Sequence, residues 1–539
     1  MVYNGIEDIS LPTWVEKLPP KTGLDLLGLR NPVLSIGNIY LSGITTITPT
    51  IRYLSIRAWI IWKYAQLALP DSLKVMREFS SKIESAIVFG NLLNKRDTFG
   101  LIGRNEGVHI IERDVDPLPL ERLVKGPIAL DIYTGPSLQL GIGQEVDSEV
   151  YGLSKERGLP LALEIDRQIK NTKFYQYVDD IVNIDAIKKD ILHELGSVLH
   201  VENMPDSEVQ LLLEAVIPNK PINQTEIYRV ATYSLLLQLS ANKKSIPKPS
   251  DVFMTSIDPA PNLPEVFQAV LDGWLLFTVR DMLAIVHESI LKWVVDLLPT
   301  DKRKYKTTAS DVIGELLSNE SEINHTLKEL GILKMNESFQ DLRYRDILSR
   351  CRRKIQKPIV TNGIRRWNGS FHELDLYSFA WYQSPGIIGL LPVAWIMASF
   401  RVAENNEETE SPASLLSFKE GRMRLGLEQV ILPTLKQYEK KNTQLPEILS
   451  EMIRFTIDQH LRIAWSRMAS NSENVALLYT EGENWIPVDE RDFQGGQMAS
   501  RLDEAIGWLQ QLGFIDDKGI TEKGKDILER GYTTISTNG

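Results

Sequence analysis

The sequence predicts a mainly α-helical protein of several segments, with one to three winged-helix-like units that include one at the C-terminus. Two observations support this fold class. Apolar residues recur every three or four positions along Val266–Leu298, Arg57–Leu69 and Gly426–Tyr438, which is the period of a helix with a buried face. From Met498 onward the chain then reads helix, tight turn, helix, which is the order of elements in a winged helix.

Length and composition fit a globular protein of several domains. The chain has 539 residues, of which 43% are hydrophobic and 24% charged. We expect six consecutive pieces: an N-terminal helical domain (1–125), a winged-helix-like segment (126–175), a central helical domain (176–300), a helical segment with a basic cluster (301–370), a helical domain (371–465) and a C-terminal winged-helix-like domain (466–539).

The bulk properties predict a cytoplasmic protein. The single cysteine, Cys351, excludes an internal disulfide and fits a reducing compartment. The first residues include acids and lack the apolar core of a secretory signal. The net charge of −11 means that any contact with nucleic acid must be local.

One uncharged stretch, Leu376–Phe400, is long enough to cross a bilayer. Pro385, Gly386, Gly389 and Pro392 interrupt it. A buried helix–turn–helix therefore explains it better than a membrane span, and no membrane partner is expected.

The C-terminal unit begins with a predicted helix over Met498–Leu512. A hairpin-like wing follows around residues 517–519, and Thr521 is expected to cap a final helix that ends at Gly531. Winged helices bind DNA in some proteins and dock onto proteins in others. Because Arg501 is the only basic residue of the first helix, both functions stay open for this unit.

Weaker signals of organisation lie elsewhere in the chain. A similar order of elements is predicted at Leu138–Ala162, and a fainter one at His325–Leu333. Solvated loops are predicted at Ser240–Ser250 and at the acidic sequence Glu404–Pro412. No fixed-period repeat is found, so a regular solenoid is not expected.

The most concentrated charge lies in Arg343–Arg366, where nine cations face one acid, Asp346. The local charge is +8, which leaves −19 for the rest of the chain. Planar guanidinium groups bind phosphates through two hydrogen bonds at once, so this cluster is the predicted nucleic-acid-binding site. Its members are Arg343, Arg345, Arg350, Arg352, Arg353, Lys354, Lys357, Arg365 and Arg366.

Two aromatic residues, Tyr344 and Trp367, could add stacking on bases in this cluster. On a helix, Arg350 shares a face with Arg353 and Lys354, so Arg350 and one of these two are expected to dominate phosphate binding. Two other interpretations stay open. The cluster could pair with the chain's own acidic surface, or it could bind an acidic partner subunit.

The segment Tyr177–Asp180 (YVDD) resembles the YxDD hairpin of reverse transcriptases, in which paired aspartates hold two Mg²⁺ ions. Asp131 could supply a third carboxylate. The other motifs of such polymerases are missing, and the preceding run Pro160–Lys173 is helical in pattern. A metal-dependent enzyme at this hairpin is therefore the second hypothesis, and a pure protein-interaction scaffold is the third.

Other catalytic motifs are not found. The sequence has no GxxxxGK[ST] phosphate loop, no HExxH pair and no GxSxG nucleophile elbow, and its seven histidines form no ligand cluster. We therefore predict no catalytic residue, no cofactor and no bound metal. His287 lies on an apolar helix and is expected to be a hydrogen-bonded core histidine.

Several phrases resemble a group of bacterial proteins of unknown function that are encoded in phage-defence gene neighbourhoods. The resemblance implies a subunit of an antiviral complex whose partner is an ATPase, helicase or nuclease, and it supplies no mechanism. Ser42 and Thr50 depart from the usual pattern. The phrases are LDLLGL (Leu24–Leu29), GITTIT (Gly43–Thr48) with Arg52-Tyr53 and Trp59, Arg229 with Thr232–Leu235, and HLRIAWSRM (His460–Met468) followed by RLDEAIGWLQQLGFI and TEKG.

The first of these phrases predicts a structural role. Gly43 permits a tight turn, and Thr45 or Thr48 can cap the helix that carries Tyr53. Arg52 lies near the positive end of that helix dipole, so it needs a specific acceptor. We favour an internal carboxylate over a phosphate as that acceptor.

Taken together, the sequence predicts a non-enzymatic subunit of a prokaryotic antiviral defence complex. It is expected to bind nucleic acid, or a nucleic-acid-processing partner, through its basic cluster and its winged-helix-like surfaces.

Overall fold

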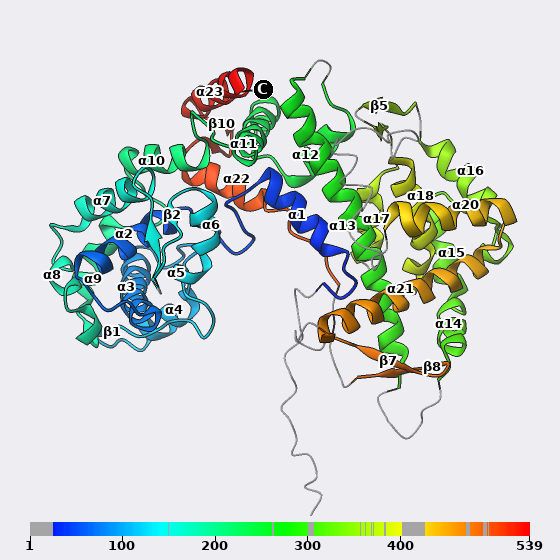
Figure 1. Ribbon diagram of the computed structural model, residues 1–539, viewed down its shortest axis with the longest axis horizontal. Helices are drawn as coiled ribbons and strands as arrows, with labels where there is room; N and C mark the ends of the chain where they lie inside the picture. Colours follow the sequence, from blue (N-terminus) through cyan, green and yellow to red (C-terminus); the bar gives the residue numbers. More distant parts are fainter. Residues whose placement is uncertain are drawn as a thin grey trace, which may run out of the picture. The chain divides into compact units, whose positions relative to one another are not determined.

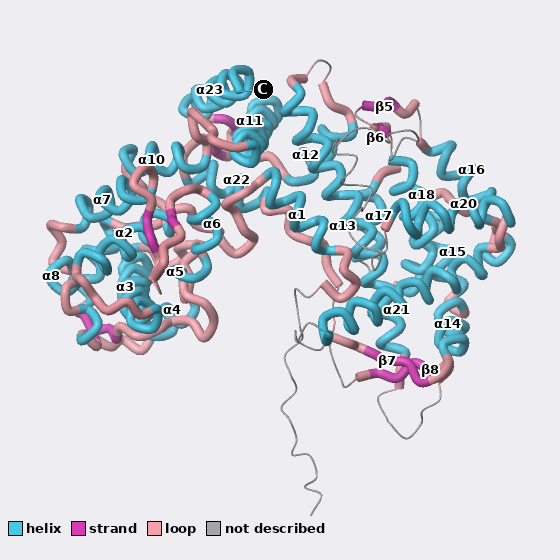
Figure 2. Tube along the Cα trace, in the orientation of Figure 1, coloured by secondary structure: helices cyan, strands magenta, loops and turns pink. Residues whose placement is uncertain are grey.

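The computed structural model describes residues 25–538, apart from residues 149, 261–262, 300–306, 356, 362, 368, 370, 382–383, 402–425, 470–474, 489–492 and 494. The predicted linker Glu404–Pro412 lies outside the described residues. Helices dominate the described chain, and its strands form two-stranded antiparallel sheets (Figure 2). The mainly α-helical fold class is confirmed.

The chain groups into two compact units, each made of pieces that are distant in sequence (Figure 1). Unit 1 contains the residues up to Ser35 and Leu275–Met498, and unit 2 contains Ile36–Trp274 and Ala499–Gly539. This grouping is coarser than the six consecutive pieces predicted from the sequence. Helices α1 (Arg30–Tyr40) and α13 (Glu265–Leu297) each carry residues of both units, and α13 confirms the long helix predicted at Val266–Leu298.

The described residues of unit 2 form a set of helices with small antiparallel strand pairs. Its strand pairs are β1 (Leu118–Pro119) with β4 (Ala186–Ile187), β2 (Gly143–Gln144) with β3 (Gly152–Leu153), and β9 (Ile515–Asp516) with β10 (Gly519–Ile520). Its helices are α2 (Tyr53–Gln66), α3 (Leu73–Asn94), α4 (Arg104–Glu112), α5 (Ala129–Ile132), α6 (Thr134–Gln139), α7 (Gly158–Ile169), α8 (Tyr175–Val178), η1 (Ile181–Asn183), α9 (Lys189–Val198), α10 (Asp206–Val216), α11 (Gln224–Lys243), α12 (Pro249–Ile257), α22 (Leu502–Gln511) and α23 (Glu522–Asn538).

Helices α3 and α9 of unit 2 cross at two glycines. A Cβ atom on Gly196 would lie 2.0 Å from the carbonyl oxygen of Gly90. Only residues without a side chain allow the two backbones to approach this closely.

Arg52, the residue before α2, has the internal acceptor that the sequence analysis favoured. It is fully buried and binds Glu208 through Nε at 3.2 Å and Nη2 at 2.9 Å. The predicted threonine cap of α2 is wrong, because Thr48 Oγ1 accepts the N–H of Thr45 instead and closes a turn before the helix.

The C-terminal piece has the predicted local order of helix α22, hairpin β9–β10 and helix α23. Thr521 accepts the N–H of Gly524 at 3.1 Å and so caps α23 as predicted. The first helix begins at Leu502 rather than Met498, and the last one continues past Gly531. Gly531 is used for packing, since a Cβ there would lie 2.1 Å from Ser234 Oγ of α11.

The two other segments for which a similar order of elements was predicted differ from each other. Residues 138–162 do contain a hairpin, β2–β3, between α6 and α7. Residues 325–333 form the end of a helix and a turn at Gly331, and no described strand follows them directly. The local order alone does not establish a winged-helix domain at any of these places.

Unit 1 is also helical in its described part, where strand β5 (Ile359–Thr361) pairs with β6 (Ile364–Arg366) and β7 (Leu478–Glu481) pairs with β8 (Asn484–Pro487). Its helices are α14 (Ala309–Leu317), α15 (Glu320–Glu329), η2 (Phe339–Asp341), α16 (Tyr344–Lys354), α17 (Glu373–Trp381), η3 (Pro385–Gly389), α18 (Leu390–Arg401), the π-helical turn η4 (Leu427–Ile431), α20 (Leu432–Lys441) and α21 (Leu445–Ala469).

The apolar stretch Leu376–Phe400 is the predicted helix–turn–helix, formed by α17, η3 and α18. Almost every side chain of α18 is buried, with α21 among its packing partners. Among the described residues, no helix is both long enough and apolar enough to cross a membrane. His287 of α13 lies in this core, where its Nε2 accepts the Trp395 indole N–H at 2.9 Å and its Nδ1 lies 2.8 Å from Thr456 Oγ1. The prediction of a hydrogen-bonded core histidine is confirmed.

Candidate nucleic-acid interface

Helix α16 carries most of the predicted basic cluster. Its apolar residues Tyr344, Ile347, Leu348 and Cys351 are buried and lie three or four positions apart, so they form one face. At the start of the helix, the carboxylate of Asp346 accepts the backbone N–H of Arg343 at 3.1 Å. The lone acid of the cluster therefore stabilises the helix N-terminus.

The opposite face of α16 is exposed and basic. It presents Arg345, Ser349, Arg352 and Arg353, which recur at helical spacing. We call Arg345, Arg352 and Arg353 the basic face. Burial of the apolar side of the helix thus fixes which arginines point outward.

The end of α20 lies beside the start of α16. Arg345 Nε donates to the carbonyl oxygen of Glu439 and Arg343 Nη1 to that of Asn442, both at 3.1 Å. These bonds satisfy carbonyl groups that the end of α20 leaves open. They also bring two exposed lysines of α20, Lys440 and Lys441, close to the basic face.

Besides Arg343 and Arg345, which donate to carbonyl groups of α20, three more of the nine predicted cations are engaged within the protein. Arg350 binds Glu337 through two nitrogens, at 2.6 and 3.1 Å, and this hydrogen bonding lowers the pKa of Glu337 to about 2. Arg366 is buried, and burial lowers its pKa to about 10. Arg365 is half-buried and donates to the carbonyl oxygen of Phe400. Arg350 therefore has fewer donors left for a phosphate than its helical position alone suggests, because a carboxylate already accepts from two of its nitrogens.

The predicted stacking residues are also unsuitable. Tyr344 is buried against Tyr438, and Trp367 is buried with its indole N–H donated to the carbonyl of Phe371 at 2.9 Å. Neither ring is presented to solvent. The other cations of the cluster keep their charge outward: within the described part of the chain, no ion pair joins an acid to Arg343, Arg345, Arg352, Arg353, Lys354 or Lys357.

Two of these outward cations rest on aromatic rings. The guanidinium carbon of Arg352 lies 5.7 Å from the ring centre of Phe400, and Lys354 Nζ lies 5.4 Å from that of Phe371. Such contacts hold a cation in place without neutralising it. Cys351, on the buried face, has its thiol pKa raised by burial to about 12, so it is not a reactive thiol.

The sequence analysis missed the hairpin β5–β6, which follows α16. Its signal is the Asn-Gly pair at 362–363, flanked by Ile-Val-Thr and Ile-Arg-Arg. The register pairs Thr361 with Ile364, which leaves a turn of two residues, and Gly363 has φ +74°. A tight turn of this kind needs positive φ, which glycine adopts without strain.

The YxDD-like segment is not a hairpin. Residues 175–178 form the short helix α8, and Asp179 pairs with Lys63 at 2.9 Å. Asp131 binds Arg77 and Tyr151 instead of facing Asp179 across a shared site. Among the described residues, no three His, Cys, Asp or Glu side chains are grouped to share a metal ion. A polymerase-like site at this segment therefore has no geometric support.

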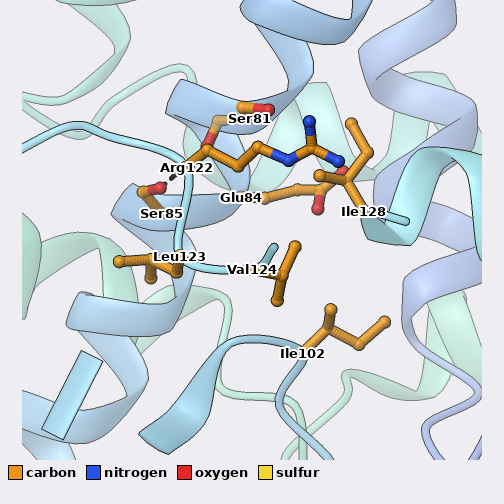
Figure 3. Close-up of a pocket in the computed structure, with 8 residues that line it drawn as sticks. All are labelled: Ser81, Glu84, Ser85, Ile102, Arg122, Leu123, Val124 and Ile128. Atoms are coloured by element: carbon orange, nitrogen blue, oxygen red, sulfur yellow. Dashed lines mark hydrogen bonds between the residues drawn. The ribbon is translucent and has the colours of Figure 1, made fainter. Parts of the chain in front are cut away.

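A small cavity of about 10 Å³ in unit 2 is lined by Ser81, Glu84, Ser85, Arg122 and neighbouring apolar side chains (Figure 3). Glu84 is buried, and burial raises its pKa to about 6. Its oxygens accept the N–H groups of Ala129 and Leu130 and the hydroxyl of Ser80. Both oxygens of this carboxylate are therefore already hydrogen-bonded within the protein, and the cavity has room for about one water molecule.

A buried ionic group in unit 1 was also missed by the sequence analysis. Arg30 binds Asp281 at 2.8 Å and Glu288 at 2.5 and 2.7 Å. Asp281 also accepts the N–H of Met498 and the hydroxyl of Tyr377, yet burial raises its pKa to about 7. All of these groups satisfy one another, so we assign them to stability.

Comparison of the chain with protein-family models, with curated proteins and with solved structures found no match.

Proposed function

We propose that the protein is a non-enzymatic nucleic-acid-binding subunit that contacts phosphates through the basic face of α16. One observation carries the proposal: arginines on a single exposed helix face have no acidic partner among the described residues, in a chain whose net charge is −11. An acidic protein gains little from leaving such a group unpaired unless an anion binds it. The resemblance to phage-defence proteins supports placing this activity in an antiviral complex with a nucleic-acid-processing partner.

The dimensions of the face suit a phosphate backbone. Arg345 and Arg352 are seven residues apart, which corresponds to about 10 Å along a helix axis. Together with Arg353 and the lysines of α20, the face offers contacts to about three to five phosphates. Contacts of this kind position a protein on a nucleic acid but carry no base information. We therefore expect binding without strong sequence preference.

The test is fluorescence anisotropy of the full chain with labelled duplex DNA, single-stranded DNA and RNA across a range of salt concentrations. Replacing Arg345, Arg352 and Arg353 with Ala should weaken binding to every sequence. On duplex DNA it should also flatten the slope of log K against log salt by about 0.9 per lost contact, roughly three units in all.

Arg350→Ala is the matched control, because it removes the same side chain from the same helix but from a position already bound to Glu337. We expect its affinity to stay within about twofold of the wild type. No binding by the wild type at low salt, or an equal loss in the control and the triple variant, would contradict the proposal.

A further inference from the structure

Strand β5 forms the edge of a two-stranded sheet. Its partner is β6, with Val360 opposite Arg365 and Thr361 opposite Ile364. Within the described residues no other strand pairs with it. Opposed pairs in an antiparallel ladder alternate between bonded and non-bonded, and the residues that flank a two-residue turn are a bonded pair. The peptide groups of Val360 and Arg365 therefore point away from each other, toward the two outer edges.

The outer edges of the two strands differ. On the β6 side, Arg401 Nη1 donates to the outward carbonyl of Arg365 at 3.1 Å, and α18 packs against the strand. On the β5 side, no described residue makes a hydrogen bond to the backbone of Val360. One edge is therefore covered, and the other offers an N–H and a carbonyl.

The side chains of β5 are open on both faces. Ile359 is 67% exposed and Val360 55%, and successive residues of a strand point to opposite faces. Natural edge strands are usually protected by charge, proline or a covering segment. A β-branched strand with a free edge is the kind of surface to which an extended peptide adds as a further strand.

Cations lie on both sides of this strand. Lys357 is exposed just before it, and Arg365 lies across from Val360 on the covered strand β6. Arg352 and Arg365 both contact Phe400, so they flank the same residue. A second copy of this chain would bring these like charges together, whereas an acidic strand would be attracted to them.

We infer that the outer edge of β5 docks an extended acidic segment of a partner protein, which pairs with Val360 through main-chain hydrogen bonds. The apolar face of that segment would cover Val360, and carboxylates on its other face would approach Lys357, the exposed cation that precedes the strand. The inference does not rest on the nucleic-acid function, because it depends on backbone groups that a phosphate contact does not use.

The experiment measures binding of a fluorescein-labelled peptide of about eight residues, alternating Glu with Val, to the full chain. Val360→Pro removes the outward N–H but leaves the ladder bonds of Ile359 and Thr361 in place. We expect it to weaken peptide binding by about tenfold or more. Val360→Thr, the matched control, keeps the N–H and the branched side chain, and should stay within about twofold. In the wild type, peptide should also slow amide hydrogen exchange across 359–364.

Four results would overturn the inference. They are equal peptide binding by Val360→Pro and the wild type, no binding to the wild type at about 1 mM peptide, a loss in Val360→Pro of nucleic-acid affinity alone, or a wild-type dimer that Val360→Pro dissociates. If Val360→Pro fails to fold, Val360→Asp serves instead. It keeps the N–H, and its added carboxylate should weaken the Glu–Val peptide more than a Lys–Val peptide.

Discussion

Arg52 of unit 2 and the arginines of α16 in unit 1 are the same residue type near or on a helix, yet they meet opposite surroundings. Arg52 is fully buried, bound to Glu208 through two nitrogens, and its Nη1 donates to the carbonyl of His200 at 2.6 Å. Arg352 and Arg353 are exposed, and no described acid pairs with them. The charge of a guanidinium is available to an anion only where the fold gives it no acidic partner, and a count of arginines in a sequence does not show this.

The sharpest test of this contrast is the stability of two matched variants. Arg52→Ala should lower the free energy of unfolding by about 3–5 kcal/mol, because it leaves the buried Glu208 carboxylate without its partner. Arg353→Ala should change that free energy by less than about 0.5 kcal/mol. Denaturant unfolding of the full chain measures both. Similar losses in the two variants would mean that α16 needs its arginines for folding.

The buried carboxylates extend the comparison to the effect of pH. Burial raises the pKa of Asp281 to about 7 from an ordinary value of 3.8. Between these values the native state keeps a proton that the unfolded chain releases, so stability falls as pH rises through this window, by up to about 1.4 kcal/mol per pH unit.

Asp281→Asn should flatten this pH dependence, and Asp180→Asn, at an exposed carboxyl group, is its control. Unfolding curves measured from about pH 5 to pH 8 give the slopes. A slope that is the same in the wild type and in Asp281→Asn would show that Arg30 keeps the carboxylate ionised throughout.

The smallest expected effect separates two arginines of one helix. Arg350→Ala removes a half-buried pair with Glu337 and should lower the free energy of unfolding by about 1 kcal/mol, with nucleic-acid affinity unchanged. Arg353→Ala should do the reverse, leaving stability unchanged and weakening binding. If Arg350→Ala weakens binding more than Arg353→Ala, internal pairing does not decide which arginines act.

The sequence by itself determined the elements whose signals are local. The 3.6-residue period of apolar positions correctly predicted α13. Proline and glycine interruptions predicted the helix–turn–helix over Leu376–Phe400, and a tight turn with a threonine cap predicted the order of elements at the C-terminus. These predictions are correct because residues close together in the chain decide whether a helix has one apolar face to bury. The Asn-Gly pair before β6 is an equally local signal, but the sequence analysis did not predict this hairpin.

Only the tertiary structure decided which of the nine clustered cations are available and how the chain divides into two units. Glu208 lies 156 residues from Arg52, and Asn442 at the end of α20 lies 99 residues from Arg343, so these groups meet only in the folded chain. Gly531, which the sequence suggested as a helix end, serves a close approach to α11. Acceptors and packing surfaces that lie so far apart in sequence cannot be predicted from a local pattern, because burial and ion pairing depend on which segments fold against each other.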